Sequence, residues 1–202
     1  MNFNTWLFQT LLSDKPSQYF EEVKASKFLK ENLPELVALI DVPQNPKWHP
    51  EGDVWTHTMM VIDQASILKN DASNPLYFMM AALMHDYGKA TTTKEDEKGV
   101  LCSIGHELQL DLIETGLSRI SENRELHAYV LNMVKLHMRP NALVHMNSSS
   151  KAFKKMFAQA INPYDLLLLA KADHKGRLNV SDYVPLETKL QEEYENFLKM
   201  NA

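Results

Sequence analysis

The sequence has one cysteine, only six glycines and no apolar run long enough to span a membrane. A lone cysteine, Cys102, excludes an internal disulfide and a thiolate zinc cage, so any metal must be held by His, Asp or Glu. Few glycines and no alternating apolar and polar stretches between turns argue against a sheet protein. The N-terminus lacks the basic region of a signal peptide, and we expect a soluble, cytoplasmic protein without membrane segments.

The sequence is also short of positive charge. With 26 Asp and Glu against 21 Lys and Arg, the formal net charge is -5. This balance argues against a broad nucleic-acid surface, because affinity for phosphate backbones comes from many clustered cations. Lys151, Lys154 and Lys155 follow a serine run at 148–150 and form a small basic face. That face is either solvated or a guide for nucleotide phosphates.

Helical periodicity dominates what is present, and it predicts an all-α fold. Hydrophobic residues make up 45% of the 202 residues, which suits one globular domain. Apolar residues recur three and four positions apart in eight segments. We predict helices at 17–31, 53–69, 75–87, 104–119, 123–138, 149–160, 163–175 and 186–199.

The breaks between these segments define the predicted organisation of the domain. Pro43, Pro46 and Pro50 mark an irregular loop, Gly88 is expected to end one helix, and Pro140 follows another. The polar stretch 90–102 is predicted to be a loop. We predict one domain over 1–202, with an N-terminal helical extension to about residue 40, a core over about 41–185 and a C-terminal helix over about 186–202.

Histidines and aspartates at predicted helix ends indicate a metal site. His57 lies in the first turns of a helix that Asp53 could cap, His85 and Asp86 close an apolar helix, and Asp173 lies near the end of a leucine-rich one. A carboxylate there is costly to bury unless it is paired or bound to a cation. Adjacent side chains on a helix diverge by about 100°, so His85 and Asp86 can share an ion only if the helix ends there.

These ligand types narrow the choice of metal. Imidazole nitrogen and carboxylate oxygen without thiolate suit manganese, iron, nickel, zinc or magnesium at a hydrolytic centre. A His-Asp pair alone is common and predicts little. The order of His57, then His85 with Asp86, then Asp173 is the signature H…HD…D of the HD superfamily. The chain therefore resembles that superfamily.

The surrounding blocks make the resemblance more specific. The stretch PKWHPEGDVWTHTMMVIDQ at 46–64, followed by AALMHDYGK, GHE and KADHKGR, resembles the C-terminal HD domain of bacterial tRNA nucleotidyltransferases over about residues 40 to 185. The resemblance implies a helical fold in which His57, His85, Asp86 and Asp173 hold a divalent metal. It also implies hydrolysis of phosphomonoesters or phosphodiesters, including 2',3'-cyclic nucleotides. Residues 1–40 are too short for the nucleotidyltransferase head, and we expect no nucleotidyl transfer.

The resemblance extends to further site residues. His106 and His137 match the two histidines that add a second metal in some HD phosphodiesterases, with Asp86 as the bridge. Lys89 resembles the lysine of the HDxGK motif and could reach a phosphate. Arg177 matches a D-x-x-G-R ending and has a phosphate-binding or a structural role. Tyr87 replaces the usual leucine and could alter the shape of the substrate site.

The expected reaction uses one or two divalent metal ions to activate a water molecule that attacks phosphorus. Asp86 would anchor the ions, Asp173 could accept a proton and Lys89 would offset phosphate charge. The expected partner is a small phosphorylated substrate, a nucleotide, or else an RNA end. An HD-fold diiron oxygenase and a non-catalytic RNA- or nucleotide-binding module are the alternatives.

The other histidines and the tryptophans are expected to be structural. His49, His127, His145 and His174 lack the helix-end acidic neighbours of the metal set, although Glu51 could orient a ligand as a hydrogen-bond acceptor. The three tryptophans are expected to pack in the core, because aromatic residues at helical spacing usually do. They are Trp6, Trp48 and Trp55.

Overall fold

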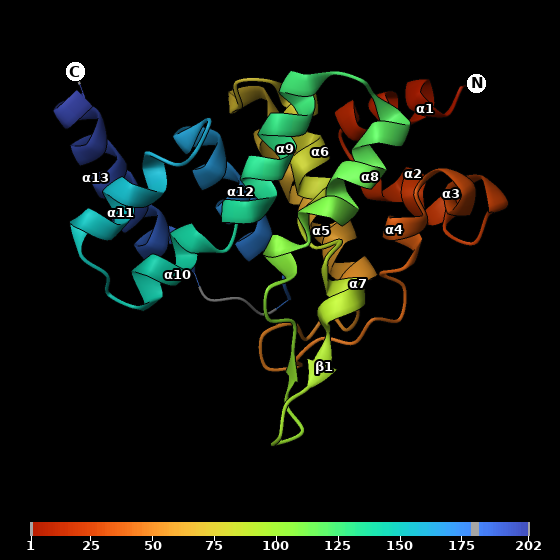
Figure 1. Cartoon of the computed structure of the whole chain (residues 1–202), viewed down its shortest axis with the longest axis horizontal. Coiled ribbons are helices and arrows are strands. Elements are labelled where there is room, and N and C mark those ends of the chain that lie inside the picture. The colour runs from red at the N-terminus through yellow and green to blue at the C-terminus, as the bar shows by residue number, and fades with distance from the viewer. Residues whose placement is uncertain (1, 179–181, 202) are drawn as a thin grey trace.

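The computed structural model describes residues 2–178 and 182–201 and is built almost entirely of helices (Figure 1). Met1, residues 179–181 and Ala202, which the predicted single domain includes, lie outside the described residues. The elements are α1 (Phe3–Leu12), α2 (Pro16–Val23), α3 (Lys27–Asn32), α4 (Pro34–Val37), α5 (Val54–Leu68), η1 (Lys69–Asp71), α6 (Pro75–Met84), α7 (Lys89–Thr92), β1 (Lys94–Glu95), β2 (Leu101–Cys102), η2 (His106–Leu108), α8 (Leu110–Ile120), α9 (Arg124–Leu136), α10 (Arg139–His145), α11 (Ser150–Phe157), α12 (Pro163–Lys175) and α13 (Val184–Asn201).

The predicted all-α fold is confirmed, with local differences. The segment 17–31 forms two helices, α2 and α3, and the stretch 90–102 contains α7 and an antiparallel pair of two-residue strands instead of a loop. This hairpin projects from the helical body (Figure 1). Pro140 lies in the first turn of α10, where a missing N–H costs nothing because no intrahelical acceptor exists there.

The helices that carry the predicted site begin at side-chain caps. Asp53 accepts a hydrogen bond from the Thr56 N–H at 2.9 Å and starts α5, as predicted. Asn74, Asn123 and Asn162 cap α6, α9 and α12 in the same way. Such caps satisfy N–H groups that have no partner within the helix. The starting points of these four helices are therefore encoded locally.

The apolar core lies around α6. Every residue from Phe78 to Met84 is fully buried, so this helix has no solvent-facing side over that length. Helices α1, α5, α9 and α12 pack against it. Trp55 is buried and Trp6 is half-buried, but 58% of Trp48 is exposed. The prediction that Trp48 packs in the core is wrong, because the loop before α5 carries it to the surface.

Across residues 2–178 and 182–201, every helix is too short or too polar to serve as a membrane span. The buried hydrophobic side chains of the same residues form one core cluster, which extends from Leu7 in α1 to Leu190 in α13. The division into an N-terminal extension, a core and a C-terminal helix stays a prediction.

Helices α5 and α12 approach each other closely at a glycine. Gly176, which ends α12, has an ordinary φ of -76° but faces Val61 of α5. A Cβ at Gly176 would lie 2.9 Å from the Val61 backbone nitrogen and 2.4 Å from its Cγ2. There is therefore no space for a side chain at position 176. The close contact also holds His57 of α5 beside the end of α12.

We expect Gly176→Ala to destabilise the protein by about 1–3 kcal/mol, because the added methyl group meets backbone atoms that cannot move aside. Gly116→Ala is the matched control. It lies inside α8, where the nearest heavy atoms to a new Cβ are 3.7 Å away, so alanine should stabilise the helix by about 0.5–1 kcal/mol. Urea unfolding of both variants measures the difference. Equal stability of the two variants would contradict the close approach.

Candidate metal centre

The predicted ligands lie at helix ends that meet in one place. His57 is in the first turn of α5, His85 directly follows α6 with Asp86 after it, His137 directly follows α9, and Asp173 lies in the last turn of α12. His106 begins the short helix η2. All of these side chains are buried. The structure therefore brings together the whole predicted set: His57, His85, Asp86, His106, His137 and Asp173.

Backbone carbonyl groups fix the orientation of three of these imidazoles in the same manner. The Nδ1–H of His85 donates to the carbonyl oxygen of Ala82 at 2.8 Å, and that of His137 donates to Val134 at 2.6 Å. Both acceptors belong to the last turn of a helix, where carbonyl groups lack intrahelical partners. His106 donates to the carbonyl of the residue three before it, at 2.8 Å.

The fourth imidazole is fixed by a carboxylate and a carbonyl. The Nδ1 atom of His57 lies 3.0 Å from Glu51 Oε1 and 3.2 Å from the carbonyl oxygen of Gly176. Since a carbonyl or carboxylate oxygen only accepts, Nδ1 is the protonated nitrogen in all four histidines. A neutral imidazole with this tautomer has its lone pair on Nε2, the form that a metal ligand needs.

The first group of ligand atoms joins His57, His85 and Asp173. Its three ligand atoms lie within 4.8 Å of one another. His57 Nε2 is 3.1 Å from Asp173 Oδ1 and 3.6 Å from Asp86 Oδ2, and His85 Nε2 is 3.2 Å from the same Asp86 oxygen. Two imidazoles thus face Oδ2 of Asp86, and that of His57 also lies beside Asp173.

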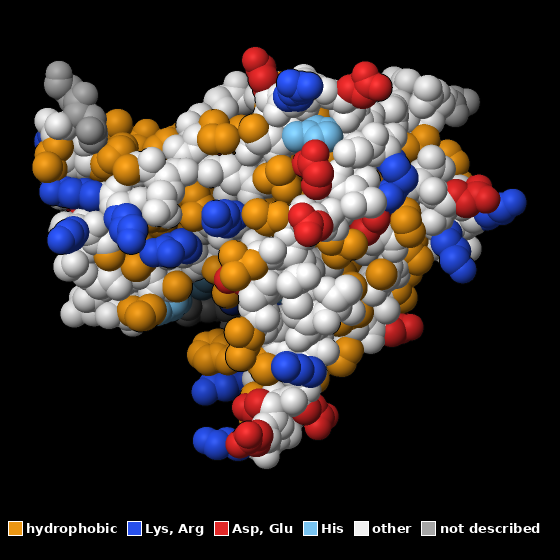
Figure 2. Space-filling view, viewed as in Figure 1, with side chains coloured by type: hydrophobic (Ala, Val, Ile, Leu, Met, Phe, Trp, Pro, Cys, Tyr) orange, Lys and Arg blue, Asp and Glu red, His pale blue; other side chains and the backbone are white. Residues whose placement is uncertain are grey.

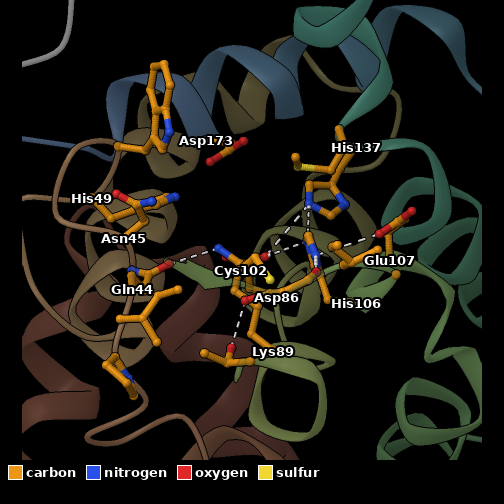
Figure 3. A pocket seen from close by; sticks show the side chains of 18 of the residues that line it. Gln44, Asn45, His49, Asp86, Lys89, Cys102, His106, Glu107, His137 and Asp173 are labelled. Carbon is orange, nitrogen blue, oxygen red and sulfur yellow. Dashed lines mark hydrogen bonds and ion pairs between the residues drawn. The ribbon is translucent and has the colours of Figure 1, made fainter. Parts of the chain in front are cut away.

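The second group joins Asp86, His106 and His137. His106 Nε2 lies 3.1 Å from Asp86 Oδ1, and His137 Nε2 lies 3.8 Å from the same oxygen. Figure 3 shows the three side chains pointing toward one another. Oδ2 of Asp86 faces the first group and Oδ1 faces the second, so this carboxylate lies between the two groups of ligand atoms.

Neighbouring cations keep both carboxylates ionised. Burial alone would raise the pKa of Asp86, but the charges of His85 and Lys89 hold this pKa well below its ordinary value. Burial would also raise the pKa of Asp173, and the Arg177 guanidinium is the main group that lowers it well below its ordinary value. Two buried negative charges therefore persist at neutral pH.

The pKa values of three of the ligand histidines are shifted in different directions. Burial acts to lower the pKa of His85 and of His106, but the Asp86 carboxylate outweighs it and both pKa values are raised. Burial lowers the pKa of His137 to about 3, and the charges of His85 and His106 act in the same direction. His137 is therefore neutral, as a metal ligand must be.

Two buried nitrogen atoms without a hydrogen-bond partner among the described residues indicate whether a cation fits this site. The Nε2 atoms of His57 and His85 are buried and make no hydrogen bond with any residue that the structure describes. A buried acceptor without a partner costs about 1–3 kcal/mol, and here each one faces a carboxylate oxygen that is also an acceptor. A divalent cation resolves both problems, so the donor set fits one.

Two side-chain cations lie beside the carboxylates. Lys89 Nζ is 2.7 Å from Asp86 Oδ2 and donates to Gln44 Oε1 at 2.9 Å. Arg177 donates from Nη2 to both oxygens of Asp173 at 3.1 Å. Both residues line the cavity above the site.

A cavity of about 640 Å³ opens over the two ligand groups. Its floor includes Asp86, His137 and Asp173, and its walls are the loop 43–49 on one side and residues 100–107 on the other. Figure 2 shows this face hollowed between the projecting hairpin and the lobe of α10 and α11, with hydrophobic side chains at its edge. The volume is typical of a small-molecule site.

His49 was expected to be structural, but this residue lines the cavity. Its Nδ1–H donates to Glu51 Oε1 at 2.9 Å, and the same oxygen lies beside Nδ1 of His57. Glu51 therefore orients both rings, as expected of it for a ligand. Burial lowers the pKa of His49 to about 4. The HPEGD block, already singled out by the resemblance, was the signal that could have identified this residue.

Two residues of the HDYGK segment lie differently from what the sequence suggested. Tyr87 is fully buried in the core and is absent from the described cavity lining, so its side chain does not contact the cavity directly. Gly88 does not end α6, which stops at Met84; its φ is -61°, and it begins α7. A Cβ at Gly88 would lie 2.1 Å from the carbonyl oxygen of His106. Glycine is needed there so that His106 can approach.

The remaining candidates lie away from the cavity. His127 donates toward Glu114 and the Ser121 carbonyl, His174 packs against Tyr183, and His145 is exposed. The basic residues Lys151 and Lys155 are exposed on α11, in the region where Figure 2 shows several basic side chains together.

Comparison with known proteins assigns the class. The family model for the HD domain matches residues 54–178, which is more than half of the chain, so the chain belongs to the HD domain family. HD domains form a superfamily of metal-dependent phosphohydrolases and bind divalent metals. The matched segment runs from the first residue of α5 to just beyond α12 and contains all six predicted ligands.

The chain is similar in particular to multifunctional CCA proteins. It is 30% identical to that of Vibrio vulnificus (strain YJ016) over 205 residues, which cover 96% of this chain and 47% of the relative. It is 36% identical to that of Burkholderia mallei (strain SAVP1) over 195 residues, covering 91% of this chain and 42% of the relative. The chain thus spans less than half the length of these curated relatives.

Removal of single ligands should separate two metal positions. His106→Ala should reduce the retained metal from two ions per chain to one, Asp173→Ala should remove the other ion, and Asp86→Asn should release both because both groups use this carboxylate. Elemental analysis of the purified variants measures the metal content. His127→Ala, a histidine outside the centre, is the control and should retain both ions. Identical loss from His106→Ala and Asp173→Ala would contradict the two-group arrangement.

Metal affinity should fall as the pH falls. In the metal-free protein the pKa values of His85 and His106 are raised, so these ligands hold protons that a metal must displace. Lowering the pH from about 8 to about 5.5 therefore weakens binding, and binding near neutral pH releases protons. Calorimetry in two buffers of different ionisation enthalpy measures the released protons. Binding that strengthens with acidity would have the wrong sign.

Proposed function

We propose that this protein hydrolyses phosphate esters of nucleotides at a centre of two divalent metal ions. The substrate would be a phosphomonoester or phosphodiester, including a 2',3'-cyclic nucleotide. The position of Asp86 carries the proposal, because its two carboxylate oxygens face two separate groups of ligands on the floor of one cavity. Membership of the HD family and similarity to multifunctional CCA proteins support it.

The six ligands would hold the metal ions, and a donor set of only nitrogen and oxygen suits manganese, iron, nickel, magnesium or zinc. Divalent cations at such a centre supply Lewis acidity, which strengthens water as a nucleophile and offsets charge on the phosphoryl group. Asp173 lies at the cavity floor as an ionised carboxylate. Arg177 holds this carboxylate in place through both oxygens.

Lys89 would bind the phosphate. Its ammonium group is buried beside Asp86 but also lines the cavity, and its second partner is the neutral Gln44 side chain. A metal ion bound by Asp86 would compete with Lys89 for the same oxygen, which would leave the ammonium group available to an anion. Two cationic side chains above the ligands favour a phosphate substrate over the reaction of a diiron oxygenase.

Loss of Asp86 tests the proposed activity. Asp86→Ala should abolish both metal retention and hydrolysis of p-nitrophenyl phosphate, because both ligand groups lose their shared carboxylate. A panel of 2',3'-cyclic nucleotides, nucleotides and aryl phosphates on the metal-loaded wild type identifies the reaction. Full activity of Asp86→Ala would refute the proposal. Oxygen consumption without phosphate release would assign an oxygenase, and nucleotide binding without turnover would assign a binding module.

Loss of the Lys89 charge should weaken phosphate recognition without removing the metal. Lys89→Gln should lower kcat/KM by about 10- to 100-fold, as expected for one hydrogen bond to a charged group. The control is Lys27→Gln, an exposed lysine paired with Glu31 far from the cavity, which should leave kcat/KM unchanged. Steady-state kinetics together with metal content measures both effects. An unchanged kcat/KM in Lys89→Gln would exclude this role.

A further inference from the structure

The mouth of the cavity is apolar, in contrast to its floor. Trp48 and Val100 on opposite walls, Ile104 on the segment before η2 and Met138 after His137 all line the cavity, yet each is exposed. Trp48 is 58% exposed and Ile104 is 81% exposed. A single exposed apolar side chain needs no explanation, but four around one opening mark a binding surface.

The distribution of charge defines what kind of ligand fits. The floor carries Asp86 and Asp173 for metal and the cations Lys89 and Arg177 for an anion. The apolar residues lie at the mouth instead, so the ligand would have an anionic group at one end and an apolar group at the other. An inorganic phosphate or a small sugar phosphate would leave the mouth residues without a contact.

Trp48 specifies the shape of the apolar group. Its indole is exposed and lies on the loop that forms one wall, with Lys47 Nζ 4.9 Å from the ring centre. A cation lies over one face of a ring, which leaves the opposite face for a flat partner. Planar aromatic rings stack on such a face, and a nucleobase does so with about 1–3 kcal/mol.

Polar groups on the same walls suit the edges of a nucleobase. Asn45 lies next to Trp48 on the loop 43–49, and Ser103 lies on the opposite wall. His49 presents a ring whose Nδ1–H is taken by Glu51, so its other nitrogen is an acceptor for a hydroxyl group. A nucleoside offers both amide-like edges and sugar hydroxyls, whereas a lipid chain offers neither.

We propose that Trp48 is the specificity-determining residue that stacks on the nucleobase of the substrate, with Ile104 against it at the cavity mouth. The inference rests on the proposed function for the position of the phosphate, but the base-binding surface is a separate part of the cavity. Trp48 therefore affects substrate binding, and with it KM, whereas the residues of the metal centre act on the reacting atoms.

The test compares two esters that differ only in the base. These are 2',3'-cyclic AMP and the 2',3'-cyclic phosphate of 1-O-methylribose. With the metal-loaded protein, Trp48→Ala should raise KM for cyclic AMP about 5- to 100-fold, with kcat changed less than about twofold, and should leave the ester without a base unaffected. Trp48→Phe should restore most of the affinity, because phenylalanine also stacks.

Met146→Ala is the matched control. Met146 is also an exposed apolar side chain, but it lies after α10 and is absent from the described lining of the cavity. Its loss should leave KM for cyclic AMP unchanged. If Trp48→Ala changes KM for both esters equally, or for neither, the assignment of Trp48 is wrong.

Binding of adenosine tests the surface without any hydrolysis. Adenosine has the base but no phosphate, and it should quench the fluorescence of wild-type protein but not of Trp48→Phe, which retains the half-buried Trp6 and the buried Trp55, both absent from the described lining of the cavity. Calorimetry should still detect adenosine binding to Trp48→Phe and a loss of binding in Trp48→Ala. Absence of hydrolysis with intact quenching would reject the proposed function and support the base-binding surface. Hydrolysis without quenching or base discrimination would reject the surface alone.

Discussion

The burial of ionised groups in one place governs this structure. Four imidazoles present their Nε2 atoms toward the carboxylates of Asp86 and Asp173, and a hydrogen bond from Nδ1 orients each ring. Charged and polar groups in a medium of low polarity are costly to bury, so the surrounding packing must supply the free energy that keeps them together. The fully buried α6 and its contacts with α5, α9 and α12 provide this packing.

Helix ends can both position and orient the ligands of such a centre. A residue just beyond the last turn can reach back to a carbonyl that the helix itself does not use, and His85 and His137 both do so. The partial negative charge at a helix C-terminus also favours a nearby cation. Because the chain leaves α6 at His85, the next residue can turn its carboxylate to the other ligands, and the adjacent His85 and Asp86 contribute to the same centre without diverging.

The sequence predicted the ligands better than it predicted the cavity. His57, His85 and Asp173 stood out because each lies at a predicted helix end, and the order of these residues, shared with the HD superfamily, assigned them as ligands. Trp48 and His49 could not be assigned in this way, because the loop 43–49 has no periodicity and its direction depends on tertiary contacts such as the hydrogen bond from Gln44 to the Asp53 carbonyl.

The errors along the chain have related physical causes. The hairpin of β1 and β2 was missed because each strand has only two residues, too few for an alternating pattern. Tyr87 was expected to be able to influence the shape of the substrate site, because it lies beside Asp86 in sequence. On a helical turn, successive side chains diverge by about 100°, and Tyr87 points into the core instead.

The contact between Gly88 and the His106 carbonyl links two segments that are distant in sequence. A methyl group at residue 88 would occupy the place of that carbonyl and push His106 away from Asp86. The glycine of the HDYGK segment and the backbone of the GHE segment are therefore one steric unit, and a larger residue at position 88 requires the backbone at position 106 to move. Because that backbone also holds the imidazole of His106 beside Asp86, a side chain at position 88 would be felt at the metal ligands although it contacts none of them.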